Sequence, residues 1–481
     1  MRKGSGKMYE MKDHNFFRSY EQRKNDPFCL RTSKIFGYLF QESNLRDNNM
    51  KHIVIVLGDI YNNPGANAIC VKKISDQLLI EGYKVTVVCQ AQKSNRLKEI
   101  DFDGYKIFFM NVFRDQLWYY ANKKKNDSKN IYAKILWMSI QFSLRVLQGI
   151  YAIFLWPSTG KWFTKKALKQ LKTIDTGSKI DCIITVSMPY EAHLAGYRFK
   201  SHRKEVKWIT YTLDSFVDSP TLQRYYIFKL FKKLINKRSE RKVFKSANAN
   251  FLSLALKEFV DTKYNQNNQK FNWVSFPLIL KPNLNTQTEY FDKTKINVVF
   301  AGSFYRIIRN PEYCLRLFSM IQNEEIILHL FHKGDCLDII EKYTRLSEKI
   351  IAYGSLPVEK IYEVESQADI LLSIGNSVAH FYPSKLLEYI SFGKPIINVH
   401  DKRYDYSSLL NRYPLVLNIE NNGNNYDRDK ERLVRFCEKN KNKRIEFSCI
   451  ERLYWESTPA YISSLFINEI ERPNTKNNVF Q

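Results

Sequence analysis

The residues of this chain best suited to ligand chemistry gather at 381–399, FYPSKLLEYISFGKPIINV. Ser384 is a good helix N-cap, apolar residues follow it at helical spacing, and Gly393 ends the helix before an apolar strand. The first turn of such a helix offers free backbone N–H groups and the positive end of the helix dipole, to which Lys385 adds a full charge. This arrangement suits a phosphate, and Glu388, one turn later, can accept hydrogen bonds from a sugar hydroxyl. A position for a diphosphate beside a position for a ribose indicates that the ligand is a nucleotide.

Polar residues in the N-terminal half follow apolar segments that are typical of buried strands. Residues 181–186 lead into a loop that reaches His193, and residues 206–213 end at Asp214. In an open α/β sheet, ligands bind beyond the carboxyl ends of the strands. His193 and Asp214 are therefore candidate catalytic residues. A lone histidine is more often a structural core residue, so both interpretations of His193 stay open.

The elements that would position these groups alternate between strands and helices. A strand at 53–57, a turn containing Gly65, a helix at 71–80 and a strand at 84–89 form a Rossmann-like βαβ start. The turn lacks the G-x-G-x-x-G spacing, which argues against a dinucleotide cofactor. Gly65 either lets the backbone approach a ligand or only forms a tight turn.

A second alternating unit begins with an apolar strand at 296–300 and continues through strand candidates at 326–331 and 368–373. Two arginines, Arg306 and Arg309, lie in the loop after its first strand. Arginine suits phosphate because its planar fork can bind two phosphate oxygens at once.

The run PSKLLEY at 383–389, followed by GKP at 393–395, resembles the donor-site signature of GT-B glycosyltransferases. It is most similar to family four, the retaining enzymes of capsule, lipopolysaccharide and exopolysaccharide synthesis. The resemblance implies an α/β chain of two Rossmann-like domains, whose parallel sheets face a central cleft. It also implies a hexosyltransferase that uses a nucleotide-sugar, UDP- or GDP-linked, as donor substrate and requires no cofactor.

The same resemblance assigns roles to the donor-site residues. Glu388 would bind the ribose of the nucleotide. The donor diphosphate would be held by the helix start and by basic residues of the earlier loop, with Arg309 preferred over Arg306. These diphosphate-binding residues are Ser384, Lys385, Arg309 and Arg306.

One position departs from the resembled pattern, Glu-x7-Glu. Counting back from Glu388 reaches His380 where the family has its first Glu, which touches the transferred sugar. The identity of the sugar therefore does not follow from the resemblance. The loop should still face the sugar, because it directly precedes the helix start. The donor-sugar-facing residues are His380, Phe381, Tyr382 and Pro383.

On the acceptor side, the resemblance places the turn of Gly65, Ala66 and Asn67 near the donor phosphates and the acceptor. It also places His193 and Asp214 at strand ends that border the cleft. No carboxylate stands out as a nucleophile, and the resemblance implies retention, with the donor phosphate helping to deprotonate the acceptor. No Asp-x-Asp motif stands out in a suitable loop, so we expect no essential metal ion.

The chain is strongly basic, with 75 Lys+Arg against 49 Asp+Glu and a formal net charge of +26. Such a balance favours anionic partners, including membrane surfaces. Two apolar and aromatic stretches with nearby lysines, 131–156 and 225–245, suit a membrane interface, and a charge inside the first argues against a spanning helix. The alternative is that both are core-packing helices with solvated basic faces. We expect a lipid-linked or oligosaccharide acceptor and a cytoplasmic protein, peripheral on the inner face of the membrane.

The eight cysteines are scattered and form no C-x-x-C pair, which is typical of reduced core thiols. Residues 1–49 are polar and without periodicity, and we expect either a flexible extension or a start codon assigned upstream of Met50. The remaining expected segments are an acceptor domain at 50–278, a linker at 279–295, a nucleotide-sugar domain at 296–448, a crossover helix at 449–472 and a tail at 473–481.

Two other functions stay open. A sugar-nucleotide epimerase or a phosphorylase can share the GT-B fold and much of the donor site, and an epimerase needs no acceptor. A nucleic-acid-binding protein is suggested by the charge alone, yet no nucleic-acid-binding motif is present, so we expect no nucleic-acid partner.

Overall fold

The computed structural model describes residues 50–61, 65–91, 98–111, 113–154, 161–217, 219, 228–257, 260, 271–282, 288–377, 384–401, 407–421, 423 and 425–473. By its contacts the chain divides into Met1–Lys51 and His52–Gln481, and the fold given below is that of the second unit. The expected extension at 1–49 and the sugar-facing residues His380, Phe381, Tyr382 and Pro383 lie outside the described residues.

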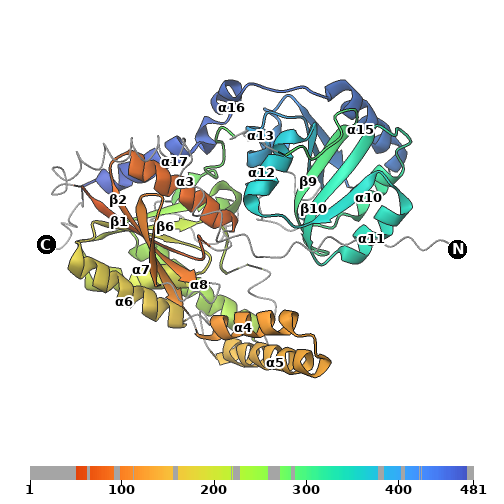
Figure 1. Ribbon diagram of the computed structural model, residues 1–481. Helices are drawn as coiled ribbons and strands as arrows, with labels where there is room; N and C mark the ends of the chain where they lie inside the picture. Colours follow the sequence, from red (N-terminus) through yellow and green to blue (C-terminus); the bar gives the residue numbers. More distant parts are fainter. Residues whose placement is uncertain are drawn as a thin grey trace. The chain divides into compact units, whose positions relative to one another are not determined.

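The first sheet has eight strands in the order β3-β4-β2-β1-β5-β6-β7-β8, and every neighbouring pair is parallel except β3 with β4 (Figure 1). Strand β1 is buried along its whole length, which explains why its residues after His52 are continuously apolar rather than alternating. The strands are β1 (His52–Leu57), β2 (Lys84–Ala91), β3 (Glu99–Phe102), β4 (Tyr105–Asn111), β5 (Cys182–Val186), β6 (Lys207–Thr212), β7 (Ala249–Ser253) and β8 (Phe271–Val274).

The helices of this half are α3 (Ala66–Ile80), α4 (Phe113–Asp127), α5 (Ile131–Phe154), α6 (Lys161–Gly177), α7 (Glu191–His202) and α8 (Lys229–Ser246). Helix α3 begins five residues earlier than the expected helix at 71–80, because Gly65 takes the N-cap position. Helices α4 and α5 pack on each other as a hairpin, in which the Tyr120 and Trp137 rings meet edge to face at 5.6 Å. Among the helices that the structure describes, none is both long and apolar enough to cross a membrane.

The second sheet has six parallel strands in the order β11-β10-β9-β12-β13-β14 (Figure 1). Its strands are β9 (Ile296–Phe304), β10 (Ile326–Gly334), β11 (Ile350–Gly354), β12 (Ile370–Ile374), β13 (Ile396–His400) and β14 (Val416–Glu420). Its helices are α10 (Glu312–Ser319), α11 (Leu337–Leu346), α12 (Val358–Gln367), α13 (Ser384–Ser391), α14 (Ser407–Leu410) and α15 (Tyr426–Asn440). The predicted α/β class with two Rossmann-like parallel sheets is confirmed.

The C-terminal segment packs on the first half of the chain. A single crossover helix was expected at 449–472, and its continuity is wrong: the segment forms α16 (Phe447–Leu453), a short 3-10 turn and α17 (Pro459–Glu471). The break has a physical cause, because Pro459 cannot continue a helix but suits the first turn of a new one, which Thr458 caps. Helix α17 contacts α3, and Phe466 stacks on Phe251 of β7 with ring centroids 4.1 Å apart. The domain boundaries themselves stay predictions.

Candidate functional site

The loops that follow two neighbouring strands of the second sheet meet at its carboxyl edge. After β9 the chain makes a tight turn, in which the backbone N–H of Arg309 donates to the Tyr305 carbonyl at 2.7 Å. The Ser377 N–H, beyond β12, donates to the Ile308 carbonyl at 2.6 Å, and Arg309 Nε donates to Asn376 Oδ1 at 3.0 Å. The structure therefore brings Arg309 next to the loop that leads toward α13.

Arg306 lies on the other side of the same turn. Its guanidinium forms an ion pair with Asp338 of α11 at 2.6 Å, and both side chains are at least half exposed. Its backbone N–H donates to Asp335. The structure thus separates the two candidate arginines: Arg309 faces the β12 loop, whereas Arg306 faces α11.

Helix α13 has the sequence features expected of it. Leu386, Leu387 and Ile390 are fully buried, and Gly393 follows the helix with φ +70°, a backbone conformation that favours glycine. A side chain at Gly393 would collide with the Ile445 carbonyl. The Tyr389 hydroxyl accepts a hydrogen bond from the Ala301 N–H at 3.2 Å and so ties α13 to β9. The predicted helix, its glycine stop and the following strand are confirmed.

Lys385 is held between two carboxylates. Its Nζ lies 2.8 Å from Glu365 Oε1 on α12 and 2.9 Å from Glu388 Oε2 on its own helix. Burial alone would lower the pKa of Lys385, but the charges of Glu365 and Glu388 outweigh it and hold that pKa well above its usual range. Lys385 thereby orients the carboxylate of Glu388.

Sequence reasoning missed Glu365, which is fully buried. Its pKa is raised to about 7, chiefly by burial and also by the charge of Glu388, while Lys385 opposes both. Its signal in the sequence is an acidic residue between two buried positions, Val364 of α12 and Ala368, which follows the helix. A buried carboxylate is costly unless it is paired, so this position calls for a cationic partner. The sequence alone does not identify that partner as Lys385.

Three elements of the first half converge at the carboxyl ends of β1, β5 and β6, which are neighbours in the sheet. Asn67 Nδ2, at the start of α3, donates to the Ser187 carbonyl and to Asp214 Oδ2, both at 3.1 Å. Burial raises the pKa of Asp214, and the Asn67 hydrogen bond lowers it in part. Two of the predicted residues, Asn67 and Asp214, are therefore in direct contact. Gly65 and Ala66 adjoin them and are exposed.

His193 is built into the core beneath these loops. Its Nδ1 lies 2.8 Å from Thr185 Oγ1 and its Nε2 lies 3.2 Å from Thr212 Oγ1, so both ring nitrogens have a hydroxyl partner. The side chain is 2% exposed, and burial lowers its pKa to about 3. The ring is thus neutral and anchors β5 and β6 to α7.

Helix α3 is electrostatically coupled to both clusters. Burial raises the pKa of the Cys70 thiol, and the charges of Glu388 and Asp214 raise it further. Burial lowers the pKa of Lys73, Lys385 contributes to that lowering, and Glu388 opposes it. Within the described ranges no three His, Cys, Asp or Glu side chains are grouped as metal ligands.

No protein-family model matches the chain, and no curated protein matches it significantly. Three solved structures illustrate what its fold resembles. A sucrose-phosphate synthase from Thermosynechococcus elongatus has a TM-score of 0.57 at 12% identity, over 87% of this chain and 98% of that one. An α,α-trehalose-phosphate synthase (UDP-forming) from Burkholderia xenovorans, in complex with glucose-6-phosphate, has a TM-score of 0.55 at 8% identity, over 88% and 100%. An E. coli trehalose-6-phosphate structure bound with UDP-2-fluoro glucose has a TM-score of 0.52 at 10% identity, over 88% and 99%. These likenesses show that the chain shares the GT-B fold of glycosyltransferase structures.

Proposed function

We propose that this protein is a hexosyltransferase that moves a sugar from a nucleotide-sugar to a saccharide acceptor. The observation that carries the proposal is the arrangement at the carboxyl edge of the second sheet. There Lys385 fixes the carboxylate of Glu388, 8% exposed, while Arg309 is held by Asn376 of the neighbouring loop. A carboxylate for the ribose hydroxyls and a guanidinium for the phosphates are the two recognition groups that a nucleoside diphosphate requires.

In this proposal Arg309 and the start of α13, including Ser384, stabilise the diphosphate as it leaves the anomeric carbon. Arg306 contributes less, because its charge is already matched by Asp338. Lys385 adds positive potential and positions Glu388. His380, Phe381, Tyr382 and Pro383 face the sugar. The UDP-forming neighbour and the one bound with a UDP-sugar put uridine first among the bases to test, with guanosine second.

The acceptor would bind at the carboxyl edge of the first sheet. Asp214 and the turn of Gly65, Ala66 and Asn67 offer hydrogen-bond acceptors and donors to an incoming hydroxyl. His193 positions these loops through Thr185 and Thr212 and does not touch the substrate. Transfer proceeds with retention, as in family four, and the donor phosphate helps to deprotonate the acceptor.

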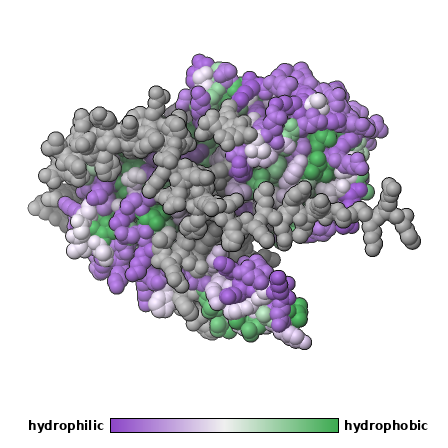
Figure 2. Space-filling view, viewed as in Figure 1, coloured by the Kyte–Doolittle hydropathy of each residue, from purple (hydrophilic) through white to green (hydrophobic). Residues whose placement is uncertain are grey.

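We further propose that the protein works at an anionic membrane surface on a lipid-linked acceptor of surface-polysaccharide synthesis. The support is a set of exposed apolar side chains on the α4–α5 hairpin, which Figure 2 shows gathered over that part of the molecule. On α5 they are Ile131, Tyr132, Ile135, Leu136, Met138, Phe142, Val146, Leu147 and Ile150. Lys123, Lys124, Lys125 and Lys129 lie next to them in the sequence. Exposed apolar surface beside lysines suits a bilayer interface.

A thermal-shift titration with nucleoside diphosphates and nucleotide-sugars tests the donor site. One nucleoside diphosphate should stabilise the wild-type protein, and the shift should be lost in Glu388→Ala. Glu341→Ala, which removes an exposed glutamate from α11, is the matched control and should keep the shift. Absence of a shift with every nucleotide would contradict the proposal.

A further inference from the structure

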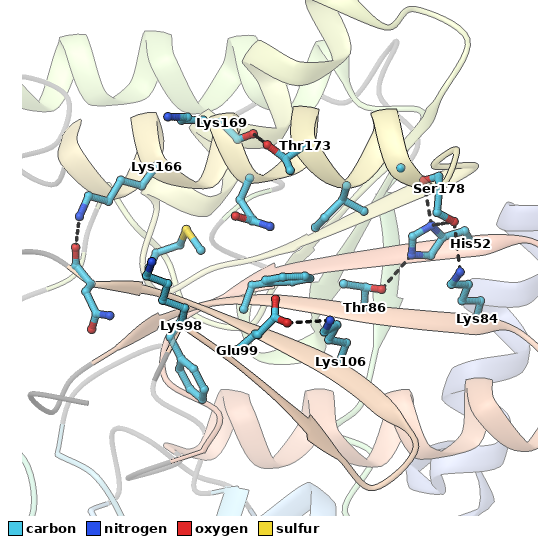
Figure 3. Close-up of a pocket in the computed structure, with 17 residues that line it drawn as sticks. His52, Lys84, Thr86, Lys98, Glu99, Lys106, Lys166, Lys169, Thr173 and Ser178 are labelled. Atoms are coloured by element: carbon cyan, nitrogen blue, oxygen red, sulfur yellow. Dashed lines mark hydrogen bonds and ion pairs between the residues drawn. The ribbon is translucent and has the colours of Figure 1, made fainter. Parts of the chain in front are cut away.

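A cavity of about 910 Å³ lies on the first half of the chain, between α6 and the β2–β4 side of the sheet (Figure 3). It contains none of the residues assigned above to the donor or the acceptor. Its lining is basic: Lys84, Lys98, Lys106, Lys166 and Lys169 against the single carboxylate of Glu99, a formal sum of five minus one, or +4.

The wall formed by α6 follows from the helical period. Lys166, Lys169, Gln170 and Thr173 recur three and four residues apart, so they share one face of the helix and line the cavity. The adjoining stripe, Phe163, Ala167, Leu171 and Ile174, is buried in the core, and Ile174 also lines the cavity. The lysines are exposed on a helix whose other face is fixed, so their positions along the cavity are set by the fold.

The floor is the face of β4 that packs against α6 and that α6 covers only in part. Lys106, Phe108 and Met110 alternate along the strand and all line the cavity. Glu99 forms an ion pair with Lys106 at 2.8 Å, so the one carboxylate of the lining already has a cationic partner. Lys98, Lys166 and Lys169 lie in the left half of the view in Figure 3, which we call the basic end of the cavity, and there Lys166 donates to the Asn111 carbonyl.

This basic end adjoins the apolar hairpin. The chain passes from Asn111 at the end of β4 almost directly into α4, and α5 is followed by α6, whose first turns carry Lys166 and Lys169. Both walls of the cavity are thus connected to the hairpin that carries the exposed apolar residues. A molecule held at the hairpin by its hydrocarbon part would present its polar part to these lysines.

We propose that the cavity binds a phosphate group, and that its source is the headgroup of an anionic lipid; the choice of source rests on the proposed membrane attachment. Lys98, Lys166 and Lys169 bind the phosphate oxygens by charge-assisted hydrogen bonds, and Phe108 and Met110 receive the adjoining apolar atoms. A soluble phosphate ester offers the same chemistry, so the test includes it.

The test compares two lysine pairs on the same helix. Lys166→Gln/Lys169→Gln removes two cavity charges, whereas Lys165→Gln/Lys172→Gln removes two exposed charges that do not line the cavity. Binding is measured to phosphatidylcholine vesicles with and without phosphatidic acid, and to glycerol 3-phosphate by calorimetry. We expect the cavity pair to weaken binding to phosphatidic acid vesicles roughly tenfold more than the control pair, which loses only diffuse attraction.

Equal losses for the two pairs, in both the vesicle and the glycerol 3-phosphate arms, would overturn the proposal. A loss specific to the cavity pair with glycerol 3-phosphate but not with vesicles would support the phosphate site and assign a soluble source. The thermal shift by a nucleoside diphosphate should be unchanged in the cavity pair. If no nucleotide shifts the wild-type protein while the cavity-specific loss persists, the transferase proposal fails and the phosphate site stands.

Discussion

The carboxyl edges of the two sheets carry different chemistry. The edge of the second sheet is ionic: Arg309 lies against Asn376, and Lys385 joins Glu365 to Glu388. At the edge of the first sheet the Asn67 amide donates to a backbone carbonyl and to the carboxylate of Asp214, and neither of these two side chains is a cation. A diphosphate carries full charges and needs cations already in place, whereas a sugar hydroxyl needs only hydrogen-bond partners. This difference is why we propose that the donor binds the second half and the acceptor the first.

The largest expected effect distinguishes the two arginines of the second sheet. Arg309→Ala should lower kcat/KM for the nucleotide-sugar by about 100- to 1000-fold, since it removes a donor aimed at the developing charge of the leaving diphosphate. Arg306→Ala should change it by less than about tenfold, because its charge is matched by Asp338 on the surface. Steady-state kinetics with the donor identified by thermal shift give both values. Equal losses of kcat/KM in the two variants would contradict the assignment of Arg309 as the main ligand of the diphosphate.

The next effect compares one carboxylate from each sheet. Glu388→Ala should weaken binding of the nucleoside diphosphate by roughly ten- to a hundredfold, the value of a hydrogen bond to a charged group. Asp214→Asn should leave that affinity unchanged and lower turnover with the acceptor. Calorimetric titration and initial rates separate the two. A loss of nucleotide affinity in Asp214→Asn would contradict the proposal that the nucleotide binds only at the edge of the second sheet.

A third prediction concerns Glu365, whose pKa is raised to about 7 from an ordinary 4.5. The folded state binds the proton more tightly than the unfolded state, so the stabilisation is fully present below about pH 4.5 and is lost as the pH rises through 7. The slope reaches at most about 1.4 kcal/mol per pH unit. Urea unfolding between about pH 4.5 and 7 measures this change. The free energy of unfolding of wild type should fall as the pH rises, and that of Glu365→Gln should fall less.

His193 should change the free energy of unfolding with pH in the opposite direction to Glu365. The limiting slope is the same, and the change is smaller near neutral pH. Its pKa is lowered to about 3 from 6.5, so its contribution is present above pH 6.5 and is lost as the pH falls toward 3. His329 on β10, lowered to about 4, adds to the same trend. In His193→Gln the acid loss of unfolding free energy should be shallower than in wild type. If the free energy of unfolding of His193→Gln falls with acid as steeply as that of wild type, His193 binds its proton equally well in the folded and unfolded states, which would contradict the lowered pKa.

Much of the second site could be predicted because its signals are local. A capped apolar helix, a glycine with positive φ and a following strand are properties of neighbouring residues, and α13, Gly393 and β13 appear where the pattern indicates them. Arg309 is named as a diphosphate ligand through the resemblance to GT-B glycosyltransferases, and this role stays a prediction.

What could not be predicted depends on contacts between distant elements. Glu365 pairs with Lys385 only because α12 packs beside α13, and no periodicity gives that distance. His193 lies among residues that also suit a cleft, and only the positions of Thr185 and Thr212 decide that its ring is satisfied internally. The basic cavity likewise could not be predicted, because it depends on how far α6 covers the face of β4.

We propose that the carboxylate of Glu388, at the edge of the second sheet, accepts hydrogen bonds from the ribose hydroxyls of a nucleotide. Calorimetric titration of wild type and Glu388→Gln with a nucleoside diphosphate and its 2′,3′-dideoxy counterpart tests it most directly. We expect wild type to prefer the ribonucleotide by about tenfold or more, and Glu388→Gln to lose most of this preference while still binding through the diphosphate. Equal affinity of wild type for both nucleotides, or a preference that survives in Glu388→Gln, would contradict it.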